Sequence, residues 1–130
     1  MTTELNDATE SAQDDRFTAD DMPPDMASFT LVLLRRPDNA PDFPEEELER
    51  LQAGHLAHLD RFRADGSIAA AGPFSDQLDP RLRGVELWTL PVDEVRRRCE
   101  EDPSVQAGRL EKHVMRWWFR ETDLPFTPAR

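Results

Sequence analysis

A histidine lies at the centre of an apolar helix face. Residues 44–64 are expected to form an amphipathic helix, and at about 100° per residue Leu48 and Phe62 fall roughly 20° to either side of His55. A neutral imidazole ionises near physiological pH and is the side chain that enzymes most often use as a general base. His55 is therefore either a core histidine whose ring is satisfied by a partner, or the base of a reaction.

Asp102 is a carboxylate with a clear structural role, and His55 could be a second partner for it. Because Pro103 follows it, Asp102 is well suited to be the N-cap of a short helical turn over residues 103–108. It also follows the second predicted helix, whose dipole disfavours a negative charge there by about 0.3–1 kcal/mol. One carboxylate oxygen can cap the turn while the other meets the imidazole, which would fix the histidine tautomer and raise its basicity. The capping role and the catalytic role are therefore compatible.

Four further residues are candidates for contact with a substrate. His58 lies about 60° from His55 on the helical wheel and is expected at the rim of a pocket. Gly72 and Pro73 follow a strand of small side chains, where they either end the strand or leave room for a ligand beside the backbone. Trp88 is expected in the core or at a dimer interface, or lining the pocket.

The remaining reactive side chains give weaker signals. Arg35 or Arg36, at the end of the first predicted strand, could bind a substrate carboxylate through two hydrogen bonds, although an exposed strand end is the simpler interpretation. A metal site at His55 and His58 would need further ligands, and we predict none. Cys99 is the only cysteine, so an internal disulfide is excluded, and we expect it on the apolar side of a helix.

The elements that must position these residues follow the order β-α-β-β-α-β. This order predicts an α+β, ferredoxin-like domain with a four-stranded antiparallel sheet and both helices on one face. The first strand is expected to be buried on both faces, and Gly72-Pro73 is expected to stop regular pairing. The uncovered sheet face would be apolar, which favours a homodimer through the two sheet faces. The predicted elements are strands at 29–34, 67–71, 84–90 and 110–120 and helices at 44–64 and 92–101.

The length and the acidic net charge of the chain limit the kinds of partner that we expect. The 130 residues suffice for one small domain, and eight acidic residues against Arg16 give residues 1–26 a charge of −7 out of the total of −11. This balance argues against nucleic acid and against anionic membrane surfaces as partners. We expect a disordered acidic tail over 1–26, the domain over 27–121 and a C-terminal tail over 122–130. The N-terminal residues lack the pattern of a signal peptide, so a cytoplasmic protein is expected.

Three segments resemble the YciI-like (YCII-related) proteins. They are Gly54-His55-Leu56-Ala57-His58-Leu59, Asp65-Gly66 followed by Ala71-Gly72-Pro73, and Glu101-Asp102-Pro103-Ser104-Val105-Gln106-Ala107-Gly108. The resemblance covers residues 28–121 and implies a dimeric α+β barrel whose pocket holds a His–Asp dyad, mapped onto His55 and Asp102. Some relatives are similar to dehydrochlorinases or lyases that act on small ring compounds. The acidic N-terminus and the Trp117-Trp118 pair depart from the family pattern.

Residues and resemblance together predict a small-molecule enzyme of the lyase or isomerase type. His55, oriented by Asp102, would be the general base, the substrate would be small and cyclic or oxygenated, and no redox cofactor would be needed. The alternative is a non-catalytic module that binds a small ligand or another protein, in which His55 and Asp102 form a buried structural pair.

Overall fold

The computed structural model describes residues 15–124, in two compact units. One unit is Ala27–Phe119, which contains every candidate site residue. The other consists of the chain before Ala27 and after Phe119; its described part includes short 3-10 turns at Ala19–Asp21 and Glu121–Asp123. Residues 1–14 and 125–130 of the predicted tails lie outside the described residues.

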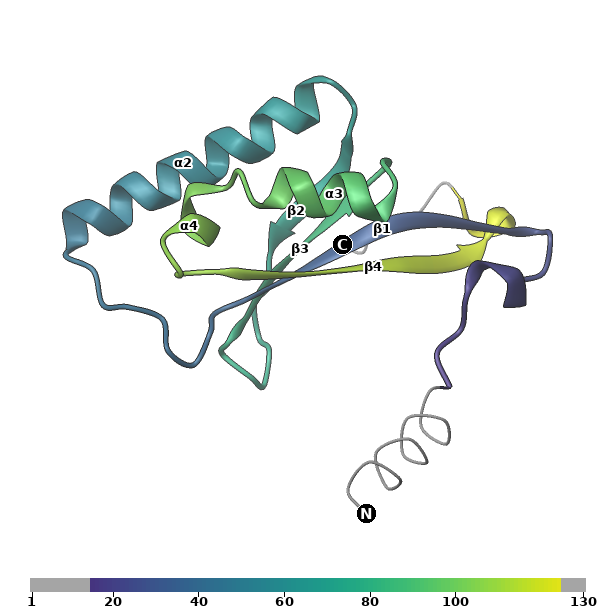
Figure 1. Cartoon of the computed structure of the whole chain (residues 1–130), viewed down its shortest axis with the longest axis horizontal. Helices are drawn as coiled ribbons and strands as arrows, with labels where there is room; N and C mark the ends of the chain where they lie inside the picture. Colours follow the sequence, from purple (N-terminus) through teal and green to yellow (C-terminus); the bar gives the residue numbers. More distant parts are fainter. Residues whose placement is uncertain (1–14, 125–130) are drawn as a thin grey trace, which may run out of the picture. The chain divides into compact units, whose positions relative to one another are not determined.

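The sheet has four strands in the order β2-β3-β1-β4, which is the ferredoxin-like order (Figure 1). Strand β3 pairs antiparallel with both β1 and β2. The predicted α+β fold is therefore confirmed. The elements in chain order are β1 (Met26–Arg35), α2 (Glu45–Ala64), β2 (Ile68–Pro73), β3 (Leu82–Trp88), α3 (Val92–Cys99), α4 (Pro103–Gln106) and β4 (Glu111–Arg120).

Helix α2 has the bounds that its sequence predicts. Pro44 is the N-cap, and three glutamates in the first turn complement the positive end of the helix dipole. The helix ends at Asp65, and Gly66 takes a φ of 81°, the left-handed conformation that terminates many helices. The buried side chains of α2 are those on one stripe, Leu51, His55, His58, Leu59 and Phe62.

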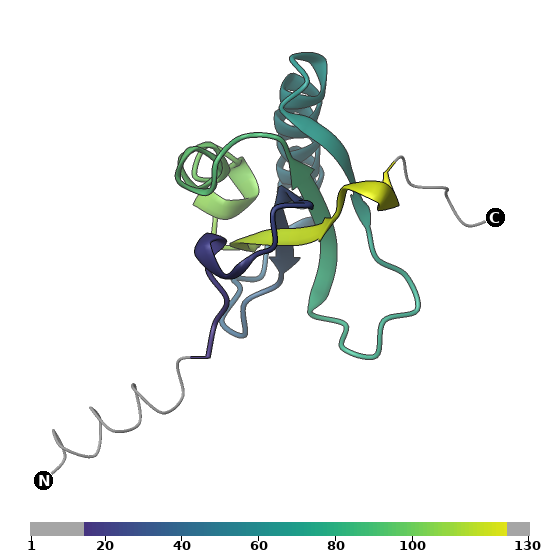
Figure 2. The same ribbon diagram turned by 90° about the vertical axis from the view of Figure 1, so that its right-hand side faces the viewer.

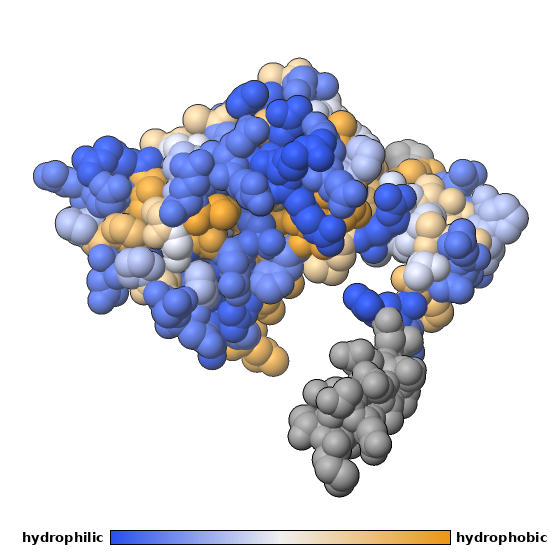
Figure 3. All heavy atoms as spheres, in the orientation of Figure 1, coloured by the Kyte–Doolittle hydropathy of each residue, from blue (hydrophilic) through white to orange (hydrophobic). Residues whose placement is uncertain are grey.

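Helices α2 and α3 cover the same face of the sheet (Figures 1 and 2). Their buried side chains join those of β1, β2 and β3 in one apolar core of Val32, Leu34, Leu59, Phe62, Ile68, Trp88, Val95 and Cys99. Burial raises the pKa of the Cys99 thiol to about 12, so it remains a protonated, unreactive core residue. The outer side of α3 is hydrophilic, as Figure 3 shows.

In the single chain, β1 is fully buried on one face only, at Thr30, Val32 and Leu34, because the helices cover that face of the sheet. The expectation that Gly72-Pro73 stops regular pairing is wrong, because pairing continues through both residues, which lie opposite Val85 and Gly84. Strand β2 is at the edge of the sheet, where a proline is tolerated because one side of the strand needs no ladder hydrogen bonds.

Within the described part of the chain, no helix is long and apolar enough to cross a membrane.

Candidate functional site

His55 reaches Asp102 through its Nδ1 atom, at 2.6 Å from Oδ2. Helix α2 supplies the histidine, and the loop between α3 and α4 supplies the aspartate. The imidazole side chain is 10% exposed and the carboxylate is completely buried. The two residues that the sequence pairs across 47 positions are therefore in direct contact, as a His–Asp pair requires.

A glycine allows this contact. Gly54 lies where α2 meets α4, and a Cβ atom built on it would be 2.9 Å from Cγ of Pro103, closer than carbon atoms pack. The Ser104 hydroxyl also donates a hydrogen bond of 3.2 Å to the Leu51 carbonyl oxygen, which ties the short helix to α2. The missing side chain at Gly54 thus brings α4, and with it Asp102, against His55.

The other oxygen of Asp102 caps α4. Oδ1 accepts a 2.9 Å hydrogen bond from the backbone N–H of Ser104, as the Asp-Pro pattern predicts. Burial by itself raises the pKa of Asp102, but the hydrogen bond from His55 and the charge of Lys112 lower it more, to well below its ordinary range. Asp102 is therefore an ionised carboxylate that serves the helix cap and the imidazole together.

Lys112 and Glu86 complete a buried ion cluster that the sequence did not reveal. The Nζ atom of Lys112 lies 2.8 Å from Oε2 of Glu86 and 2.9 Å from Oδ2 of Asp102, and the three side chains are at most 1% exposed. Trp88 donates a 2.9 Å hydrogen bond from Nε1 to Oε1 of Glu86. Burial lowers the pKa of Lys112, but the charges of Glu86 and Asp102 outweigh this effect and raise it. Two carboxylates thus face one ammonium group, and the cluster carries a net charge of −1.

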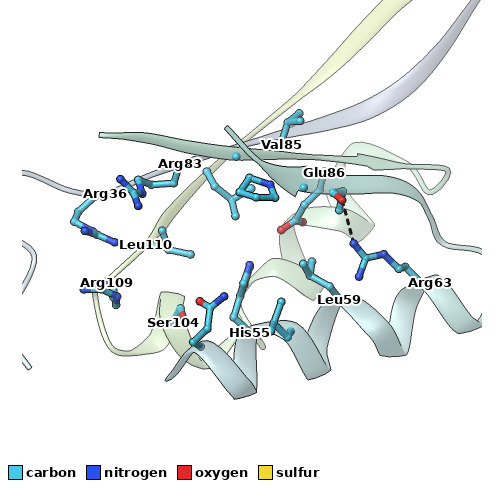
Figure 4. Close-up of a pocket in the computed structure, with 17 residues that line it drawn as sticks. Arg36, His55, Leu59, Arg63, Arg83, Val85, Glu86, Ser104, Arg109 and Leu110 are labelled. Atoms are coloured by element: carbon cyan, nitrogen blue, oxygen red, sulfur yellow. Dashed lines mark hydrogen bonds between the residues drawn. The ribbon is translucent and has the colours of Figure 1, made fainter. Parts of the chain in front are cut away.

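A cavity of about 320 Å³ opens beside His55, within the range of small-molecule sites. Figure 4 shows the His55 side chain pointing into it from α2. Gly72 and Pro73 lie on its opposite wall, in the edge strand, so the structure brings these two candidates to the same cavity as His55. Leu34, Leu59 and Leu110 also line it.

His58 and Trp88 do not line this cavity, and their predicted contact with a substrate there is not supported. His58 points into the core, where its ring meets the Phe62 ring edge-on at 5.1 Å, and Trp88 is fully buried. Burial is the main reason that the pKa of His58 is lowered; the charge of Lys112 adds to the effect, and the carboxylates of Asp102, Glu86 and Glu101 partly oppose it. His58 is thus a neutral core histidine, one turn of the helix from the cavity.

The described residues contain no group of three or more histidine, cysteine or carboxylate side chains arranged to hold a metal ion. His113 lies on β4 with a half-exposed side chain, 3.3 Å from Glu111.

Comparison with known proteins finds a solved enzyme structure that this chain resembles. No family model and no curated protein sequence matches the chain. The 5-chloro-2-hydroxyhydroquinone dehydrochlorinase of Burkholderia phenoliruptrix AC1100, solved with 2,5-dihydroxybenzoquinone, is 25% identical. The match covers 68% of this chain and 92% of the dehydrochlorinase, with a TM-score of 0.48. Membership of the YciI-like family stays a prediction.

Gly54→Ala tests the close contact between α2 and α4. In an exposed helix the alanine would add roughly 1 kcal/mol of stability. Here we expect the free energy of unfolding, measured with urea, to fall by about 1–3 kcal/mol because Pro103 must move. Ala53→Gly, at the exposed neighbouring position, is the control and should lose only the intrinsic helix preference. A gain of stability in Gly54→Ala would show that the contact is not tight.

The buried neutral His58 makes stability depend on pH. The lowered pKa means that the unfolded chain, near its ordinary value of about 6.5, takes up a proton before the folded one does. This part of the stability is present above that value and is lost as the pH falls below it, by up to about 1.4 kcal/mol per pH unit. We expect His58→Leu to flatten the fall in melting temperature between about pH 7.5 and 5.5. His113→Gln is the exposed control; equal slopes in wild type and His58→Leu would contradict the assignment.

Proposed function

We propose that the chain is a small-molecule enzyme of the lyase or isomerase type, in which Nε2 of His55 removes a proton from a substrate held in the cavity. One observation carries the proposal: a completely buried carboxylate occupies Nδ1 of a histidine whose side chain reaches a cavity of substrate size.

The contact with Asp102 sets the tautomer of His55. Since the carboxylate is ionised, Nδ1 carries the hydrogen and donates it, and the lone pair of the neutral ring lies on Nε2. Among the described residues, Nε2 has no hydrogen-bond partner. The atom that can accept a proton is therefore the one left free for a substrate.

The ion cluster compensates the charge that forms during proton transfer. When His55 accepts a proton it becomes an imidazolium ion, and the net charge of −1 on Asp102, Glu86 and Lys112 balances it. The carboxylates are fixed before the reaction, so little reorganisation is needed at the moment of transfer. Lys112 would act as a positioning residue, because it holds Asp102 without reaching the substrate.

The chemistry that suits this base is proton abstraction beside a carbonyl group. The bond electrons of the C–H group become an enolate, which either expels a leaving group from the neighbouring carbon or is protonated again elsewhere. The first course is an elimination and the second an isomerisation. Neither course is a net oxidation or reduction of the substrate, so no redox cofactor is required. A small cyclic or oxygenated substrate fits a cavity of about 320 Å³ with leucines in its wall.

A non-catalytic ligand-binding module is the competing function. The same His–Asp pair could serve only to join α2 to α4, since Asp102 also caps α4. That function requires no proton transfer at His55.

Hydrogen exchange into substrates separates the two functions, and it does so even when the product of the reaction is not identified. A panel of small cyclic ketones, lactones and hydroxyquinones, with and without a carboxylate or phosphate group, is incubated with the protein in D₂O, and loss of C–H signals is followed by NMR. We expect exchange in at least one compound, its abolition in His55→Ala, and a reduction of about 10²–10⁴-fold in Asp102→Asn.

Arg50→Gln, on the exposed side of α2 where Arg50 pairs with Glu47, is the control and should exchange at the wild-type rate. Exchange that persists in a folded His55→Ala protein would exclude His55 as the base. A clear loss of melting temperature in His55→Ala with no exchange by the wild type would favour the structural pair.

The proposal includes a homodimer formed through the sheet face that the helices leave uncovered. Phe29, Leu31 and Leu33 of β1 alternate with its core residues and therefore lie on this face, where Leu31 pairs with Leu87. Met115 and Trp117 extend the face on β4 and are 42% and 39% exposed. A sheet face lined by apolar side chains favours an interface.

Trp117→Glu should convert the dimer to a monomer, because it places a charge inside an apolar interface. Light scattering coupled to size-exclusion chromatography measures the mass directly. Leu78→Glu, at a fully exposed leucine of the β2–β3 loop, is the control and should leave the mass unchanged. A wild-type protein that elutes as a monomer over the accessible concentration range would contradict the proposed dimer.

A further inference from the structure

Three arginines gather at one end of the cavity. Arg36 follows β1, Arg83 lies in β3, and Arg109 lies between α4 and β4. Figure 4 shows their side chains close together at this end, with His55 in the middle of the cavity and Arg63 at the opposite end. Segments that are distant in the sequence thus place three guanidinium groups in one place.

These arginines lack carboxylate partners among the described residues. Arg83 donates a hydrogen bond only to the Pro80 carbonyl oxygen, at 2.8 Å, and the Nε atom of Arg36 is buried without a hydrogen-bond partner. Arg63, by contrast, is paired with Asp60 and with the Ala71 carbonyl oxygen. The contrast is informative because the chain has 27 acidic residues against 16 basic ones, so carboxylates are not scarce.

The three guanidinium groups repel one another. Partial burial lowers the pKa of Arg36, and the positive charges of Arg109 and Arg83 lower it further. The carboxylate of Glu86 also reaches the cavity, but it is paired with the buried Lys112. An anion bound at this end would relieve the repulsion and supply the missing acceptors.

We propose that Arg36, Arg83 and Arg109 form an anion site that binds a carboxylate or phosphate group of the substrate. Guanidinium groups suit this role because their N–H groups form a planar fork that matches the oxygens of both anions. The inference rests on the proposed function in one respect: it identifies the bound anion as part of the molecule that His55 deprotonates. The substrate class is then a small organic acid or phosphate ester whose less polar body lies against the leucines of the cavity wall, Leu34, Leu59 and Leu110.

Calorimetric titration with three probes that share a phenyl ring tests the site. Benzoate carries a carboxylate, phenyl phosphate carries a phosphate, and benzamide is the neutral isostere of benzoate. We expect the wild type to bind at least one of the two anions more than about tenfold more tightly than benzamide, since charge-assisted hydrogen bonds are stronger than neutral ones. The more tightly bound anion identifies the group that the site takes.

Arg36→Gln and Arg109→Gln should each weaken the preferred anion by about 10- to 100-fold, while Arg36→Lys should recover part of the loss. Arg50→Gln is the control, because Arg50 pairs with Glu47 on the exposed side of α2. Equal affinity for benzamide and the anions, or unchanged affinity in both glutamine variants, would overturn the anion site.

His55→Ala distinguishes this failure from failure of the proposed function. It should retain anion affinity within about threefold of the wild type, because it removes the base and none of the donors. If His55→Ala abolishes C–H exchange but the arginine variants bind anions normally, the assignment of His55 as the base is supported and the anion site is contradicted. If the arginine variants lose anion binding but exchange survives in His55→Ala, the anion site is supported and the assignment of His55 as the base is contradicted.

Discussion

The burial of three charged side chains is the constraint on which the rest of this domain depends. Lys112, Glu86 and Asp102 are withdrawn from water almost completely, and an isolated charge in such a place would cost several kcal/mol. Each is tolerable only because the others hold it. The arrangement links β4 to β3 across the intervening strand β1, through Lys112 and Glu86, and it fixes the start of α4 at Asp102. His55 then meets a carboxylate whose position and ionisation are already determined by the sheet.

The position of α4 follows from this cluster and from one missing side chain. Asp102 has a single buried location that satisfies the cap of α4, Lys112 and His55 together. Gly54 allows α4 to approach α2 closely enough for that location to exist. A glycine within a helix costs about 1 kcal/mol relative to alanine, so its presence in the middle of α2 indicates that the close packing is worth at least as much. The resemblance to the YciI-like segments includes this glycine next to His55.

The fold, His55 and Asp102 could be predicted because their signals are local, whereas the other two members of the buried cluster could not. The helical period of α2 places His55 on the buried stripe. Asp102 before Pro103 is a cap pattern, which predicts a hydrogen bond from the backbone N–H of Ser104 to the Asp102 side chain. Lys112 and Glu86 could not be found in this way, because a charged residue in an alternating strand normally faces water. Their one available signal was register: Glu86 is two residues from Trp88 and Lys112 is two residues from Val114, so each shares the helix-covered face with a core residue. His58 does not line the cavity. An angle of about 60° on the helical wheel does not distinguish the rim of a cavity from the core beneath it.

The charges around the cavity are separated along its length, and this separation has a chemical consequence. The buried cluster beside His55 carries −1, whereas Arg36, Arg83 and Arg109 stand without carboxylate partners among the described residues, at one end. A substrate with one anionic group has its lowest electrostatic energy when that group is at the arginines and away from Asp102. The same charge distribution places negative charge beside His55, where positive charge develops during the proposed proton transfer. Binding and proton abstraction therefore depend on one charge distribution, which β1, β3 and the turn before β4 hold in place. The apolar part of the cavity wall between the arginines and the buried cluster determines how long the substrate must be.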